Sequence, residues 1–149
     1  MKRLLILAGD PLGVGPLVTA LAWKQLPVAI KKRSVIMGEW GSLAKAFSLA
    51  GESFPLESLV ITAYERRLNE AAAARAAAAT LEAAVRLCQR GYARAMVTAP
   101  VNKKRLQKIW PGFLGQTEWL GRMFKCRPVM TFEPPKWKRT MGPVIFLAT

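Results

Sequence analysis

The sequence predicts an α/β fold, a three-layer sandwich built around a largely parallel sheet. Short apolar runs alternate with helix-like segments along all 149 residues, and this order is typical of the fold class. The first run, Arg3–Ala8, is apolar throughout after its first residue, as expected for a strand that is buried on both faces. Alanine dominates the segment Ala71–Arg90, which has the composition of a helix that approaches a sheet closely. The crossovers between parallel strands are then expected to be right-handed.

The expected strands are short runs of aliphatic residues bounded by glycine, proline or charged residues. They are Arg3–Ala8, Val35–Gly38, Leu59–Thr62, Ala95–Thr98, Val129–Phe132 and Val144–Leu147. Only Ala148 and Thr149 follow the last of these runs, so we expect the sheet to be incomplete.

The expected helices lie between these strands and have recognisable first or last residues. Pro16 fits the first turn of one helix, Ser42 can cap the next, and Gly51 and Gly91 each follow a helix at its carboxyl end. Pro111 ends the fourth helix. The predicted spans are Pro16 to about Leu26, Ser42–Ala50, Ala71–Arg90, Lys103–Trp110 and Thr117–Phe124.

The composition excludes several kinds of active site. The sequence contains no histidine, which is the usual general base near neutral pH and the commonest metal ligand. It therefore cannot supply a Ser-His-Asp triad, a Cys-His dyad or a His-ligated metal site. Its two cysteines, Cys88 and Cys126, are too few for a four-cysteine zinc site and are expected to be reduced thiols. No catalytic residue and no metal ligand can be assigned from the residues themselves.

The formal net charge is +14 and the pI is about 10.6. Residues 101–149 contribute ten Lys or Arg but only Glu118 and Glu133 as acidic residues. This balance leaves open an alternative function, a non-catalytic basic module that binds anions or nucleic acid with a steep dependence on salt. Because charge is non-specific and no recognition motif is present, we expect nucleic acid not to be the partner.

Neither a signal peptide nor a membrane span is expected. Met1, Lys2 and Arg3 give the charge of a signal sequence, but Asp10 and Pro11 interrupt the apolar run that follows. The longest uncharged stretch, Pro11–Trp23, contains two glycines and two prolines and is too short to cross a bilayer. We therefore expect a cytoplasmic protein with no membrane segment.

A glycine-containing loop joins the first predicted strand to the first predicted helix. Gly9, Asp10, Pro11, Gly13 and Gly15 lie where glycines allow close backbone approach and where a helix N-terminus attracts anions. The loop has only part of the dinucleotide-binding fingerprint, because valine stands where the third glycine should be. A tight turn with no ligand is the alternative interpretation, and the spacing alone favours it.

Two further segments carry polar side chains near predicted strand ends. Asn102 and Lys103 follow a predicted buried strand, so they should emerge at the edge of the sheet where ligands bind. A solvated basic face is the alternative there, because Lys104, Arg105 and Lys108 lie close by. Gln116 and Thr117 begin a predicted helix. In isolation Thr117 is best interpreted as its N-cap.

Taken together, three segments resemble motifs of one enzyme family, the 4-hydroxythreonine-4-phosphate dehydrogenases of vitamin B6 biosynthesis. They are Leu7–Pro16, Val97–Lys103 and Gly112–Leu120, in that order. The resemblance covers nearly the whole chain but only the N-terminal part of the family. It implies an isopropylmalate-dehydrogenase-like fold, with residues 1–149 forming a single or partial α/β domain and a second domain absent. It also implies a homodimer, or a missing C-terminal domain, and a phosphorylated small-molecule substrate.

The resemblance further implies cofactors and roles for individual residues. NAD would accept a hydride from the substrate, and a divalent metal such as Zn, Mg or Co would polarise its hydroxyl. Gln116 and Thr117 map onto a His and a Thr that contact substrate in the family, and Asn102 and Lys103 match its active-site edge. Leu17 replaces a usual Glu. The family's metal is held by three histidines, one from the partner subunit, and this sequence has none. We therefore expect the chain alone to be inactive.

Overall fold

The computed structural model describes residues 3–132 and 145–148, and the chain divides into two compact units, residues 1–113 and 114–149. The first unit is built on a four-stranded sheet. Its strands are β1 (Arg3–Leu7), β2 (Ser34–Glu39), β3 (Leu59–Ala63) and β4 (Ala93–Thr98). All four match predicted strands to within two residues at either end.

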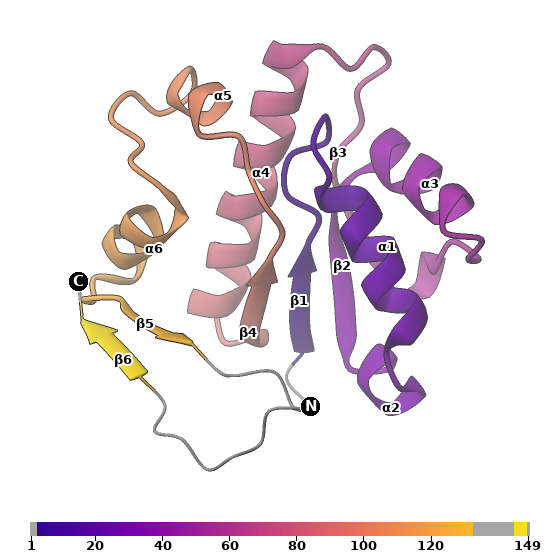
Figure 1. The fold of residues 1–149 in the computed structure, drawn as a ribbon, viewed down its shortest axis with the longest axis horizontal. Helices are drawn as coiled ribbons and strands as arrows, with labels where there is room; N and C mark the ends of the chain where they lie inside the picture. The colour runs from indigo at the N-terminus through magenta and orange to yellow at the C-terminus, as the bar shows by residue number, and fades with distance from the viewer. Residues whose placement is uncertain (1–2, 133–144, 149) are drawn as a thin grey trace. The chain divides into compact units, whose positions relative to one another are not determined.

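The sheet has the strand order β3-β2-β1-β4, and every neighbouring pair is parallel (Figure 1). Leu5 of β1 lies beside Val35 of β2 on one side and beside Met96 of β4 on the other. The chain therefore runs outward from β1 through β2 to β3, and then returns to the other side of β1 as β4. The predicted α/β class with a parallel sheet is confirmed.

Helices cover both faces of this sheet. The helices α1 (Gly15–Gln25) and α3 (Trp40–Leu49) pack together on one face, and α4 (Glu70–Gln89) contacts all four strands on the other (Figure 1). The single turn α2 (Val28–Lys31) precedes β2, a 3-10 turn (Leu56–Ser58) precedes β3, and α5 (Lys103–Gln107) follows β4.

The core beneath α1 and α3 is aromatic and aliphatic. Trp23 of α1 and Phe47 of α3 are buried with Ile36 of β2 and Leu43. The ring of Phe47 meets Phe54 edge to face at a centroid distance of 5.4 Å, a favourable arrangement for aromatic pairs. This layer fixes α3 and the β2–α3 turn, which border the candidate site.

On the opposite face, the alanines of α4 allow the helix to lie close to the sheet. Ala73, Ala77 and Ala84 are buried, and the side chain of Asn69 caps the helix by accepting from the N–H of Ala72 at 2.9 Å. The buried hydroxyl of Thr80 donates to the Ala76 carbonyl at 2.8 Å and so stays satisfied. The predicted Ala71–Arg90 helix is thus confirmed to within a residue at each end.

The second unit contains α6 (Gln116–Phe124), β5 (Val129–Phe132) and β6 (Ile145–Ala148). The two strands pair antiparallel in a sheet of their own, with Val129 beside Ala148. Both were predicted as strands, although Val144, the first residue of the last predicted strand, lies outside the described residues. That residues 1–149 form a single or partial domain stays a prediction.

Two local predictions are wrong in detail, and one short helix was not predicted at all. That helix is α2, whose four residues are too few to show a periodic pattern. The helix predicted from Lys103 to Trp110 ends at Gln107, well before Pro111. Ser42 does not cap α3. The side chain of Glu39 does so instead. Within the described residues, no helix is long and apolar enough to span a membrane.

Candidate functional site

The loop between β1 and α1 is a tight turn whose glycines are required by the protein's own backbone. Gly9 has φ +74°, and a Cβ there would lie 2.3 Å from the Pro100 carbonyl oxygen. A Cβ on Gly15 would lie 2.1 Å from the Ala8 carbonyl oxygen. Neither position tolerates a side chain. The tight-turn interpretation therefore accounts for both glycines without a ligand.

This turn is joined directly to the loop that follows β4. The N–H of Asp10 donates to the Pro100 carbonyl at 3.0 Å, and the N–H of Ala99 donates to the Leu7 carbonyl at 2.9 Å. The Asp10 carboxylate also accepts from the N–H of Leu12 at 3.0 Å. The loops after β1 and β4 thus form one connected surface at the carboxyl ends of the strands. In doubly wound sheets this edge is where ligands bind.

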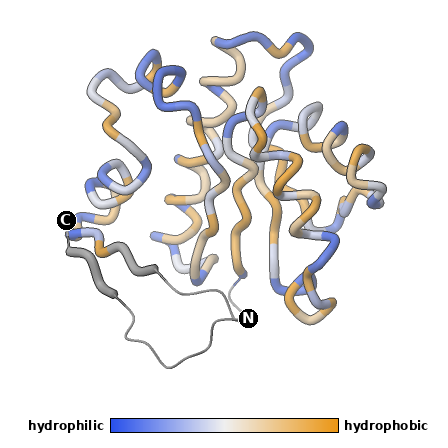
Figure 2. Tube along the Cα trace, in the orientation of Figure 1, coloured by the Kyte–Doolittle hydropathy of each residue, from blue (hydrophilic) through white to orange (hydrophobic). Residues whose placement is uncertain are grey.

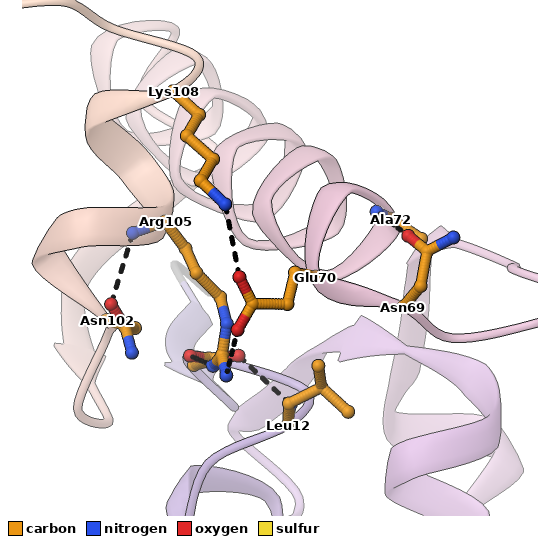
Figure 3. Close-up of polar contacts among 8 residues, drawn as sticks. Leu12, Asn69, Glu70, Ala72, Asn102, Arg105 and Lys108 are labelled. Carbon is orange, nitrogen blue, oxygen red and sulfur yellow. Dashed lines mark hydrogen bonds and ion pairs between the residues drawn. The ribbon is translucent and has the colours of Figure 1, made fainter.

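A network of charged side chains fixes α5 against this turn. The guanidinium of Arg105 reaches from α5 to the buried carboxylate of Asp10 and to Glu70 at the start of α4, the latter at 3.4 Å (Figure 3). Lys108 meets the other carboxylate oxygen of Glu70 at 3.1 Å. Three segments that are far apart in the sequence are thereby tied together at one edge.

The ionisation of the network follows from these contacts. The hydrogen bond and charge of Lys108, assisted by Arg105, hold the pKa of Glu70 below its ordinary value. Burial by itself would lower the pKa of Arg105, but the Asp10 and Glu70 carboxylates outweigh burial and raise it. Glu70 and Arg105 are therefore both charged near neutral pH.

Arg105 is a site residue that sequence reasoning missed. It was grouped with Lys104 and Lys108 as one solvated basic face, whereas its side chain is only 17% exposed and is paired with Asp10. Lys104 and Lys108 are exposed, as expected. The available signal was Asp10 itself, because a carboxylate directly after a buried strand needs a cationic partner or hydrogen-bond donors.

Asn102 and Lys103 lie at the same edge, after β4. The side-chain oxygen of Asn102 accepts from the N–H of Arg105 at 3.1 Å and so caps α5. Its side chain is otherwise exposed, as is that of Lys103 in the first turn. The amide group of Asn102 and the Lys103 ammonium are thus accessible beside the Asp10 turn. Their contact with a substrate stays a prediction.

A hollow of about 450 Å³ lies beside the turn, between the start of α1 and the start of α3. It is mostly apolar, and Lys45 is the cationic side chain on its wall. The start of α1 has no side-chain cap and no acidic residue in its first turn. The residues that line the hollow are Pro11, Leu12, Gly13, Val14, Pro16, Leu17, Gly41, Ser42, Lys45, Ala46, Leu49 and Leu68.

Glu39, at the end of β2, is buried next to this hollow. Its carboxylate accepts from the N–H groups of Gly41 at 2.9 Å and Ser42 at 2.7 Å. The Ser42 hydroxyl donates to the Glu39 carbonyl at 3.0 Å, which explains why serine is not the cap. The N–H of Glu65 approaches the same carboxylate at 3.5 Å. Glu39 is therefore engaged in holding the β2–α3 turn.

Gln116 and Thr117 belong to the second unit, at the start of α6. The N-cap is Gly115, in an extended conformation and without a side-chain cap bond, so the interpretation of Thr117 as the cap is wrong. The Nε2 of Gln116 is buried and has no hydrogen-bond partner among the described residues. An unpartnered buried amide is unusual. The grouping of these two residues with the first-unit site stays a prediction.

The residues present do not fit a divalent metal ion. Within residues 3–132 and 145–148 no group of three or more His, Cys, Asp or Glu side chains comes together, and the sequence has no histidine. Of the carboxylates near the site, Asp10 is engaged by Arg105 and Glu39 by backbone N–H groups. Cys88 and Cys126 are free thiols, as predicted, and burial raises the pKa of Cys88.

The first unit is a doubly wound α/β fold, because its parallel sheet carries helices on both faces. A glycine turn follows the inner strand β1, and polar groups lie beyond the ends of β1 and β4. Comparison with known proteins then assigns the family. The chain belongs to the family of the pyridoxal phosphate biosynthetic protein PdxA, whose family model matches residues 44–141.

Curated relatives and a solved structure agree with this assignment. A 4-hydroxythreonine-4-phosphate dehydrogenase from Zymomonas mobilis is 31% identical over 140 residues, which cover 80% of this chain and 40% of the relative. A 4-hydroxythreonine-4-phosphate dehydrogenase from Geobacter metallireducens is 28% identical over 142 residues, which cover 42% of that relative. A crystal structure of the Burkholderia phymatum enzyme superposes with a TM-score of 0.73 at 23% identity, over 91% of this chain and 47% of that one. The chain therefore spans less than half the length of the relatives it matches.

Proposed function

We propose that this chain is a substrate-binding part of a PdxA-type oxidoreductase, and that it binds 4-hydroxythreonine 4-phosphate or a closely related phosphorylated hydroxy acid. The observation that carries the proposal is the edge where the loops after β1 and β4 meet. That edge holds the Asp10 turn together with the accessible side chains of Asn102 and Lys103. The names of the relatives supply the substrate class.

Each polar residue has a role that its chemistry allows. The Lys103 ammonium carries the positive charge that a phosphate requires, and the Asn102 amide donates hydrogen bonds beside it. Gln116 donates through its Nε2, which lacks a partner among the described residues, and the Thr117 hydroxyl donates or accepts. Arg105 acts as a positioning residue, because it is occupied by Asp10 and Glu70 and holds α5 in place.

The hollow between α1 and α3 suits part of a nicotinamide cofactor. Its apolar walls match a base or ribose, while Lys45 and the uncapped N-terminus of α1 favour a phosphate. When bound, NAD would supply the hydride acceptor for alcohol oxidation. The donor groups present do not fit the divalent metal that the family resemblance implies.

We further propose that the chain binds substrate without oxidising it. Of the carboxylates near the site, Asp10 and Glu39 are both engaged within the protein, so neither is free to act as a general base. The sequence contains no histidine, whereas the family resemblance implies three at the metal. Oxidation would then depend on histidines from a further domain or from a subunit of a different polypeptide, with the assembly formed in the cytoplasm, because a second copy of these residues has no histidine to offer.

The test is a calorimetric titration of the purified chain with 4-hydroxythreonine 4-phosphate, followed by an assay for NADH with NAD and a divalent metal added. We expect binding without NADH formation. Lys103→Ala should weaken binding about tenfold, since a charge-assisted hydrogen bond contributes roughly 1.5 kcal/mol or more. Lys104→Ala, on the next exposed residue of α5, is the matched control and should bind as the wild type does.

Two results would contradict the proposal. If the chain does not bind the phosphorylated substrate, or binds it equally well after Lys103→Ala, the C-terminal edge of the sheet is not the site. If the purified chain forms NADH, the proposal that it binds substrate still holds, but the proposal that it does not oxidise substrate is wrong.

A further inference from the structure

Within the described residues of the first unit, the face of the sheet that carries α1 and α3 is covered over β2 and β3 but not over β4. Ala95 lies beside Leu4 in the sheet, and Ile6, two residues along β1, packs against the α1–α3 core, so Ala95 and Val97 face that side. Both are exposed, Val97 by 54%. Parallel sheets are normally covered on both faces. β4 therefore presents an open apolar strip on this face.

The flank of α1 that borders this strip is also apolar. Leu17 lines the hollow shared with α3, and Lys24 donates to the Ala50 carbonyl at 3.1 Å, so these two residues mark the flank facing α3. At 3.6 residues per turn, Ala22 lies on the opposite flank, and Val18 lies between that flank and the solvent side of the helix. Both are exposed, and the middle of α1 is strongly hydrophobic (Figure 2). Because the strand order is β3-β2-β1-β4, this opposite flank borders β1 and β4.

A cluster of arginines lies at the amino-terminal end of the same strip. Arg3, Arg33 and Arg94 line a cavity of about 290 Å³ together with Leu4, Ile30, Ser34 and Ala95, and no acidic residue lines it. Arg3 donates to the Lys32 carbonyl at 3.1 Å. None of the three arginines has an ion-pair partner among the described residues. Three unneutralised cations around an apolar cavity favour an anionic partner.

We propose that this surface, here called the β4 groove, docks a helix of another polypeptide that is apolar on one face and carries carboxylates at the end reaching the arginines. The groove consists of Val18, Ala22, Ala95 and Val97, with Arg3, Arg33 and Arg94 at one end. A helix is the element that covers a parallel sheet in α/β folds, and this strip lies beside α1, where a neighbouring helix packs. Charge complementarity requires that the helix be acidic at its arginine end.

Charge argues against a second copy of the chain as the occupant. A second copy of a chain with net charge +14 would bring further positive charge to the arginines. The acidic helix is the occupant that satisfies both the apolar strip and the arginine cluster.

The experiment is a fluorescence titration of the full chain with a synthetic amphipathic helical peptide. The peptide has Leu and Ala on one face and two Glu in an end turn, and a matched peptide carries Gln in place of Glu. We expect the acidic peptide to bind more tightly than its Gln counterpart, with an affinity that falls as salt rises. Arg94→Glu should weaken binding about tenfold, a change of roughly 1.4 kcal/mol. Arg66→Glu, on an exposed arginine outside the groove, should leave binding unchanged.

Val97→Asp tests the apolar strip in the same way, and circular dichroism checks that this variant folds. If it does not fold, Val18→Asp tests the α1 flank instead. The proposal is overturned if neither peptide binds, if the two peptides bind alike, or if Arg94→Glu and Arg66→Glu have equal effects. It is also overturned if the chain dimerises in a way that Val97→Asp abolishes. Binding of phosphatidylglycerol vesicles to the groove, without binding of the acidic peptide, would also overturn the proposal.

Discussion

The two ends of the sheet in the first unit handle charge in opposite ways. At the carboxyl end, Arg105 of α5 pairs with Asp10 and Glu70, and Lys108, directly after α5, also pairs with Glu70, so these pairs tie three segments together. At the amino end, Arg3, Arg33 and Arg94 surround a cavity with no carboxylate on its wall. The chain has only nine acidic residues, so their placement matters. Paired charges organise the carboxyl edge, while unpaired charges leave the amino edge suited to an anion from outside.

Removing the central cation of the carboxyl edge should have the largest effect on stability. Arg105→Met leaves the Asp10 carboxylate, which is 4% exposed, without its cationic partner. Breaking a buried pair in this way is strongly destabilising, and because Arg105 retains some exposure we expect a loss of about 2–3 kcal/mol. Urea unfolding measures this loss in the free energy of unfolding. Lys108→Met, which removes an exposed pair on the same helix, should cost less than about 0.5 kcal/mol. Equal losses in the two variants would contradict the assignment of Arg105 as the anchor.

The second prediction concerns Glu39, whose buried carboxylate is held by backbone N–H groups of α3 with no cation. Glu39→Gln keeps the shape but replaces one acceptor oxygen by an amide NH2 group, which donates and cannot accept from the N–H of Gly41 or Ser42. The loss of the cap should cost about 1–2 kcal/mol in thermal or urea unfolding. Glu57→Gln, at an exposed glutamate, is the control and should change stability by less than about 0.5 kcal/mol. A Glu39→Gln variant as stable as this control would show that the capping bonds are unimportant.

The third prediction uses pH to isolate Glu70. Its pKa in the folded protein lies below the ordinary value of 4.5 because of Lys108 and then Arg105. The stabilising contribution of Glu70 is therefore complete above about pH 4.5 and is lost as the pH falls through the folded pKa. Urea unfolding between about pH 6 and pH 3 should show a component of this loss that Glu70→Gln removes and Lys108→Met reduces. If the two variants follow the wild-type profile throughout, the network does not stabilise the fold.

The smallest effect is expected at the amino edge. Arg94→Glu places a carboxylate beside Arg3 and Arg33, which lack ion pairs among the described residues. We expect stability to rise by no more than about 0.5 kcal/mol, the usual range for an exposed pair. Unfolding at low and high salt measures the gain, which salt should remove. A loss of more than about 1 kcal/mol would mean that Arg94 already has a stabilising partner.

The fold was largely predictable from the sequence because its signals are local. Continuous apolar runs marked β1 and β4, and the alanine segment marked α4 to within a residue at each end. The rule that ligands bind beyond the carboxyl ends of parallel strands then placed Asn102 and Lys103 at the same edge as the Asp10 turn. That placement needs only the strand direction, which the βαβ pattern supplies.

The parts that could not be predicted depend on contacts between distant residues. Arg105 and Asp10 are 95 residues apart in the sequence, and no local pattern distinguishes Arg105 from the neighbouring lysines. Ser42 and Thr117 are good capping residues by type, but Glu39 and Gly115 occupy the cap positions. Residue type alone therefore does not show which of several neighbouring residues takes the cap position, because that depends on where the helix begins.

We expect a phosphorylated substrate to bind at the carboxyl edge of the sheet and not at the arginine cluster of the amino edge. NMR chemical-shift mapping of the labelled chain, titrated with 4-hydroxythreonine 4-phosphate, tests this expectation most directly. We predict shifts at the amides of Asp10, Gly13, Asn102 and Lys103 that saturate together, while Arg3, Arg33 and Arg94 stay unchanged. Saturating shifts confined to the three arginines would place the phosphate at the opposite end of the sheet and contradict this expectation.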